Sequence, residues 1–318
     1  MRNLMAFALK AAISGVLLYF AFAHVNFGLV ARQLNHLNYG WLAAAILLLL
    51  GQISLGSLRW QIIVQNCRAP DTPPFAITNA LRFNFIAAFF NQTLPSTIGG
   101  DALRVWLLGR AQGDWRTATY SVLIDRMVGV LVLAFMVIAC LPWSFALINN
   151  VTGRIALLVV GFGCVGACLT FVALGFFQGG LLDRWWLTRQ LTGAGAAART
   201  VLLAPSSGSP ILVYSLLNHF VTVTAAWCVA KSFDAPFEWG QALLLVLPVL
   251  LIASVPISIA GWGTRETAMV LAFGYAGLAE SDGLTLSVLL GIAAFATGLV
   301  GGLFWILDRG MRRSQAPR

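Results

Sequence analysis

Long apolar stretches follow one another along nearly the whole chain, and polar residues gather between them. An α-helix needs about 20 apolar residues to cross the ~30 Å hydrocarbon core of a bilayer. Six stretches meet this requirement, at residues 4–25, 40–58, 117–141, 155–177, 211–231 and 284–307. The pattern therefore predicts an all-α, polytopic integral membrane protein with about six full transmembrane helices.

Two further apolar regions, 75–112 and 240–279, are interrupted in the middle by Pro and Gly. Each region predicts a broken helical hairpin, which is either re-entrant or crosses the membrane twice. Both interpretations add an even number of crossings, so the orientation of the other spans does not depend on the choice.

Composition agrees with a membrane location, since 59% of the residues are hydrophobic and only 10% are charged. A soluble domain carries roughly 25% charged residues because its surface faces water. The net charge of +9 would suggest nucleic acid as a partner for a soluble protein. Here it predicts arginines at cytoplasmic membrane edges instead, and we expect no nucleic-acid partner.

The distribution of basic residues predicts the orientation. With the N-terminus inside, fifteen of the twenty Lys and Arg residues fall on cytoplasmic segments and four fall outside. This bias predicts that both termini are cytoplasmic. Residues 21–23 look like a signal-peptide cleavage site, but the apolar run before them is long enough to span. We expect the first helix to stay uncleaved.

The order of elements repeats. Residues 1–141 and 155–307 each read as span, span, interrupted region and span, followed by a basic tail at 308–318. Because each half has three full spans, an odd number, the second half is inverted in the membrane relative to the first. Such inverted repeats are common in transporters. Residues 95–104 and 256–265 share the pattern P-x-[ST]-I-[GA]-G-x-x-x-R. We expect a single transmembrane domain made of two inverted halves.

The two breaks predict a substrate site. Irregular backbone at membrane depth is tolerated where it lines a watery cavity or is buried in protein. We expect Asp101 and Thr264 to be N-cap residues, with a helix beginning directly after each. Arg104 and Arg265 would then lie in the first turns of these helices. Helix N-termini and arginines both favour phosphate. The alternative is that Pro and Gly only kink two spans and the arginines reach the membrane interface.

The candidate substrate-binding residues surround these breaks: Asn91, Gln92, Pro95, Gly99, Gly100, Asp101, Arg104, Pro256, Gly261, Gly263, Thr264, Arg265 and Glu266. Glu266 either neutralises Arg265 or binds a proton.

Four further polar residues fall in apolar surroundings and are expected to support the site: Asn84, Asp125, Arg126 and His219. Adjacent helix residues do not face one another, so Asp125 and Arg126 should each find another partner. We expect Asp101 to pair with Arg126, and Asp125 with Arg104. A hydrogen bond between helices is the expected role of His219, rather than proton relay.

No catalytic constellation is found in the sequence. The five cysteines lack metal-ligand spacing, and no nucleophile–base pair or nucleotide-binding loop is present. We expect no enzymatic activity, no cofactor and no metal.

Four segments together resemble the lysylphosphatidylglycerol synthase transmembrane family, also called flippase-like: Arg59-Trp60, residues 91–104, Asp125-Arg126 and residues 256–266. The resemblance covers nearly the whole chain and implies movement of an amphiphilic lipid between leaflets of the bacterial cytoplasmic membrane. The full-length synthases carry a soluble aminoacyl-transferase domain after the membrane part, and the present chain stops about ten residues after its last span. Lysine transfer is therefore not carried over.

The leading hypothesis is a translocase for an anionic phospholipid or a polyprenyl-linked lipid or glycolipid, with Arg104 and Arg265 holding the phosphate in turn. A second hypothesis is a non-transporting membrane subunit of a lipid-synthesis or glycosyl-transfer system, docked through segments 59–74 and 178–210. A third is a secondary transporter of a soluble anion. Membrane lipids are the expected partners, with a lipid-synthesis or glycosyl-transfer enzyme or a second copy of the chain as further candidates.

Overall fold

The computed structural model describes residues 37–93, 99–177, 185–255 and 263–314, and these residues are almost entirely helical. In chain order the elements are α3 (Tyr39–Cys67), α4 (Ile77–Thr93), α5 (Gly99–Gln112), α6 (Trp115–Ala139), α7 (Leu141–Leu147), α8 (Val151–Leu174), the 3-10 turn η1 (Gly175–Phe177), α9 (Trp186–Leu203), α10 (Pro205–Ser232), α11 (Trp239–Ala253), α12 (Thr264–Tyr275) and α13 (Glu280–Ser314).

Five helices of the described part of the chain are long and apolar enough to cross a membrane: α3, α6, α8 with η1, α10 and α13. They correspond to five of the six predicted spans. The remaining prediction, at residues 4–25, lies outside the described residues. The protein is therefore a polytopic helical membrane protein, as the pattern predicted.

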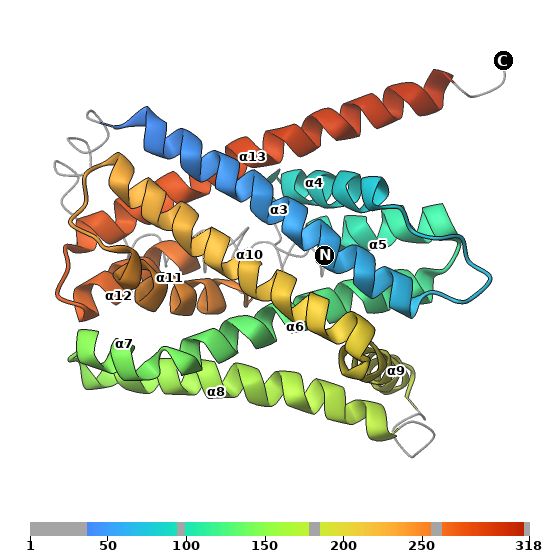
Figure 1. Cartoon of the computed structure of the whole chain (residues 1–318), viewed down its shortest axis with the longest axis horizontal. Helices are drawn as coiled ribbons and strands as arrows, with labels where there is room; N and C mark the ends of the chain where they lie inside the picture. The colour runs from blue at the N-terminus through green and yellow to red at the C-terminus, as the bar shows by residue number, and fades with distance from the viewer. Residues whose placement is uncertain (1–36, 94–98, 178–184, 256–262, 315–318) are drawn as a thin grey trace, which may run out of the picture.

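The two interrupted regions form pairs of shorter helices, α4 with α5 and α11 with α12. Each of these helices has 12 to 17 residues, which is short for a crossing. In Figure 1 the α4–α5 pair lies in the half of the molecule where α13 ends, and the α11–α12 pair lies in the half where α13 begins. The arrangement matches two re-entrant hairpins from opposite sides. Residues 94–98 and 256–262, including Pro95, Pro256 and Gly261, lie outside the described residues.

Directions of the other helices agree with an inverted plan. Helices α3 and α10 lie side by side and run antiparallel (Figure 1), and the N–H of Asn38 donates to the carbonyl oxygen of Ser232 at 2.7 Å. The second span of one half therefore packs on the second span of the other. The division into halves at 1–141 and 155–307 stays a prediction, and α7 lies between the two.

Helix α6 takes the central position. It packs against α3, α5, α8, α10 and α11. In its most apolar stretch of 18 residues, 56% of the residues are buried. Its polar residues Asp125 and Arg126 are thereby placed between the helices of both halves.

The starts of α5 and α12 differ from the prediction. Helix α5 already begins at Gly99, so Asp101 is in its first turn rather than at the N-cap, and Arg104 is in its second turn. The side chain of Asn91 on α4 supplies the acceptor for the N–H of Gly100, at 2.9 Å. Because this acceptor comes from another helix, the local sequence did not reveal it.

Helix α12 begins at Thr264, and its N-cap is Gly263 with a φ of +91°. Glycine adopts this left-handed region without the steric cost that other residues meet. The side chain of Glu266 accepts the N–H of Gly263 at 2.7 Å. Thr264 is therefore the first helical residue and not the cap, and Arg265 is in the first turn as predicted.

Close packing of α13 on α4 depends on Gly301. A Cβ atom at this position would collide with the backbone carbonyl of Phe85, which cannot rotate away. We expect Gly301→Ala to lower the free energy of unfolding by about 1–3 kcal/mol, as overpacking does. Thermal unfolding in detergent measures the effect. Gly166→Ala is the matched control because its added Cβ would meet no atom within 4 Å. Equal midpoints for the two variants would contradict this packing.

Candidate functional site

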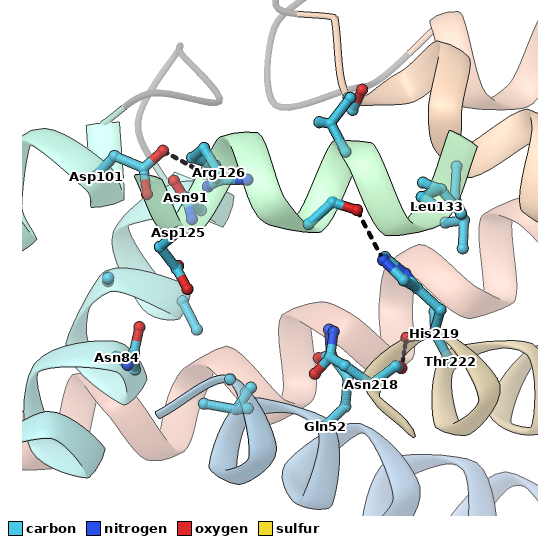
Figure 2. Close-up of a pocket in the computed structure, with 18 of the residues that line it drawn as sticks. Gln52, Asn84, Asn91, Asp101, Asp125, Arg126, Leu133, Asn218, His219 and Thr222 are labelled. Carbon is cyan, nitrogen blue, oxygen red and sulfur yellow. Dashed lines mark hydrogen bonds and ion pairs between the residues drawn. The ribbon is translucent and has the colours of Figure 1, made fainter. Parts of the chain in front are cut away.

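A polar cavity of about 440 Å³ lies between the two hairpins. Helices α3, α4, α5, α6, α10, α11 and α12 all contribute to its lining, and Figure 2 shows the polar side chains around it. Ligand pockets typically measure about 300–1,000 Å³. The space is therefore large enough for a small polar ligand or a lipid headgroup.

Asp125 of α6 is the centre of a buried ion-pair network. It accepts hydrogen bonds from Arg59 Nε at 2.8 Å and from Arg104 Nη2 at 2.9 Å. Arg59 also donates to the hydroxyl of Ser215, at 3.1 Å. Since these residues come from α3, α5, α6 and α10, the network ties four helices together. The predicted pairing of Asp125 with Arg104 is confirmed.

The position of Arg59 differs from the sequence prediction, which placed this residue on a cytoplasmic segment. Helix α3 continues to Cys67, and Arg59 is buried with 8% of its surface exposed. It is held by Asp125 and cannot form part of a docking surface at 59–74. Without Arg59 and Arg104, thirteen of these fifteen basic residues remain on segments that the sequence analysis predicted to be cytoplasmic, so the bias that predicts the orientation persists.

Asp101 and Arg126 form a second pair, with Arg126 Nε 2.6 Å from Asp101 Oδ2. This confirms the other predicted cross-pair, which Figure 2 shows at the edge of the cavity. The two arginines near Asp101 differ in access. The side chain of Arg104 is 5% exposed and lies over the ring of Trp60, whereas that of Arg126 is 52% exposed. Arg126 is thus the arginine of this network that a ligand reaches most easily.

The second hairpin contributes Arg265. Its Nη2 is 2.9 Å from Glu266 Oε1, and its Nε donates to Ser287 Oγ at 3.0 Å. Ser287 in turn donates to Glu266 at 3.1 Å. Glu266 is completely buried and neutralises Arg265, which was one of its two expected roles.

These contacts resemble those of the first hairpin, with the partner on the following span shifted by one position. Residues 104 and 265 are 161 positions apart, and their partners Asp125 and Ser287 are 162 positions apart. In both halves an arginine on the second hairpin helix faces a polar position on the following span.

Other predicted residues have mixed outcomes. His219 Nε2 is 3.0 Å from the carbonyl oxygen of Gly129, which can only accept, so His219 donates a hydrogen bond between helices as expected. Asn84 and Asn91 line the cavity. Gln92 is directed toward α13, near Gly298, and does not line it.

The sequence interpretation missed several polar residues of the site: Gln52, Arg59, Ser215, Asn218 and Ser287. Each is a polar residue within or at the end of an apolar stretch. Polar groups in transmembrane segments usually face the protein interior. Examining every such position would have found them.

An apolar groove adjoins the cavity. It has a volume of about 540 Å³ and lies between α5, α6 and α8, with Val105, Met127 and Phe171 in its lining. Asp101 and Arg126 line both spaces, so the cavity and the groove meet at this ion pair. Leu123, which is 41% exposed, also lines the groove, and the groove therefore reaches the outer surface of the described helices.

Spanning helices, two opposed hairpins and a polar cavity between them define a multi-pass membrane protein with an internal cavity. The chain belongs to the lysylphosphatidylglycerol synthase TM region family, whose model matches residues 7–302. This confirms the resemblance seen in the sequence and indicates a membrane protein of lipid metabolism or transport. Comparison with curated proteins finds no match.

Proposed function

We propose that the protein is a translocase that moves an anionic phospholipid, or a polyprenyl-linked lipid or glycolipid, between leaflets of the bacterial cytoplasmic membrane. The observation that supports the proposal best is the junction of polar cavity and apolar groove at Asp101 and Arg126. A lipid needs a polar path for its headgroup next to an apolar path for its tails. The two spaces meet this requirement side by side.

Charge in the cavity favours an anion. Three arginines of the first network face two aspartates, so one positive charge is in excess. Arg265 is balanced by Glu266. In this mechanism Arg126 binds the phosphate first because its side chain is the most exposed, and Arg265 receives it on the α12 side. Arg104, which the sequence interpretation gave the first role, holds Asp125 in place.

A secondary transporter of a soluble anion would use the same charges but has no use for an apolar groove. A non-transporting subunit of a lipid-modifying or glycosyl-transfer system would need neither the cavity nor the groove. The groove therefore favours lipid as the substrate. Both termini are proposed to face the cytoplasm, from the distribution of basic residues.

Arg265→Ala is expected to abolish movement of fluorescent phosphatidylglycerol in proteoliposomes, because the phosphate loses its partner on the α12 side. Glu266 still accepts from Gly263 and Ser287, but its buried charge loses its ion pair, so thermal unfolding in detergent accompanies the transport assay to establish that the variant is folded. Arg265→Lys keeps the charge balanced but cannot bind two oxygens in parallel, so it should retain partial activity. Wild-type rates in both variants would refute the mechanism. Absence of lipid movement by the wild-type protein, together with copurified enzymes, would favour the subunit role.

A further inference from the structure

One wall of the cavity carries uncharged amides instead of ion pairs. Gln52 of α3, Asn84 of α4 and Asn218 of α10 lie across the cavity from the Asp101–Arg126 pair in Figure 2. We call these three residues the amide wall. Their positions on three different helices place hydrogen-bonding groups around one side of the space.

Two amides of this wall have buried polar atoms without a partner. Among the described atoms, Asn84 Nδ2 and Asn218 Oδ1 make no hydrogen bond, and Asn218 is only 8% exposed. Nearly all buried polar groups in proteins are hydrogen-bonded, so such atoms require an explanation. As assigned, one is a donor and the other an acceptor, and exchanging the ends of either amide would turn its unpaired atom into the opposite kind. A ligand group that can both donate and accept would satisfy the two atoms in every assignment.

The balance of charges in the cavity argues against a cationic ligand. The acidic residues that line its described part are Asp101 and Asp125, and each forms ion pairs with two arginines. An ammonium group in the cavity would therefore meet no uncompensated carboxylate there, and it would be repelled by the excess positive charge. Hydroxyl groups fit the amide wall better, because they are neutral and can donate and accept at once.

We propose that the amide wall is a subsite for the hydroxyl groups of the headgroup, such as those of glycerol or a sugar, while Arg126 holds the attached phosphate. This inference rests on the proposed lipid movement and names the substrate class as a hydroxylated phosphodiester lipid. The amide wall then selects the headgroup, and the arginines select the charge.

Two labelled lipids test the subsite in proteoliposomes. Phosphatidylglycerol and phosphatidylmethanol each carry one negative charge, but only the former has headgroup hydroxyls. Leaving a buried amide unpaired is costly, so the wild-type protein should move phosphatidylglycerol about tenfold faster. Asn218→Leu, which keeps the branched shape of the side chain but removes its hydrogen-bonding groups, should remove the difference between the two rates. Gln52→Leu gives a second measurement if Asn218→Leu does not fold.

The outcomes separate this inference from the function on which it rests. If the wild-type protein moves both lipids equally, the subsite is wrong and the translocase proposal stands. If Asn218→Leu slows both lipids by the same factor, the residue acts on the structure and the subsite is again wrong. If the wild-type protein moves neither these lipids nor the polyprenyl lipids described next, the proposed function itself fails.

A second pair of lipids distinguishes the source of the hydroxyls. Polyprenyl phosphate with one attached hexose is compared with polyprenyl methyl phosphate, which has the same charge and no sugar. A preference for the hexose lipid that exceeds the preference for phosphatidylglycerol identifies a sugar headgroup, and the reverse identifies glycerol. The preferred pair should lose its difference in Asn218→Leu, and a preference that survives this substitution would overturn the assignment.

Discussion

Asp125→Asn is expected to lower the free energy of unfolding by about 3–5 kcal/mol, which is the usual cost of breaking a buried ion pair on one side. The substitution keeps the size of the side chain but removes the charge that Arg59 and Arg104 share. Their side chains are 10% and 5% exposed, so water can compensate little of the loss. Thermal unfolding in detergent, followed by circular dichroism, measures the change.

Apolar replacement of the whole network provides the control. The triple variant Arg59→Met, Arg104→Met and Asp125→Leu removes all three charges together, and buried ion-pair networks replaced in this way often keep their stability. We expect it to unfold closer to the wild-type midpoint than Asp125→Asn does. A single Asp125→Asn variant as stable as the wild type would show that these charges are not buried as described.

Arg126→Gln is expected to slow the movement of phosphatidylglycerol by about 10- to 100-fold, the range that corresponds to the loss of a charge-assisted hydrogen bond. The reason is its position, since Arg126 lines both the cavity and the groove and is the most exposed arginine of the network. The readout is the rate at which labelled lipid becomes accessible to a quencher outside proteoliposomes.

Arg110→Gln is the matched control for this experiment. The same chemical change is made in the last turn of α5, on an exposed side chain that does not line the cavity. Asp101 keeps Arg104 at 3.4 Å in the Arg126 variant, so its charge is still compensated and the fold should persist. Equal rates for Arg126→Gln and Arg110→Gln would exclude Arg126 as a phosphate ligand.

The sequence predicted best those features that depend on residues close together in the chain. The length of apolar stretches predicted five spans that the structure contains, and the positions of Pro and Gly predicted both hairpins. Pairing was also predictable for Asp125 and Arg126, because neighbours on a helix point in different directions and each charge in an apolar span needs a partner.

Interactions between distant segments were harder to predict. Arg59 is 66 positions from Asp125, and the helix that carries it continues beyond the apolar stretch. Asn91 caps α5 from α4, so the start of that helix was predicted three residues too late. The amide wall was missed in part because Gln52 and Asn218 belong to spans that the sequence analysis read for their apolar length, and in the second span it singled out only His219.

The two halves differ in charge, and this difference has a thermodynamic consequence for the proposed transport. The ion-pair network at the first hairpin contains two aspartates and three arginines, whereas Arg265 and Glu266 balance one another at the second hairpin. The free energy of a bound anion therefore differs between the first hairpin and the second. Such unevenness changes how long a lipid dwells at each point, but detailed balance forbids it from enriching one leaflet. Accumulation against a gradient would demand an external driving force.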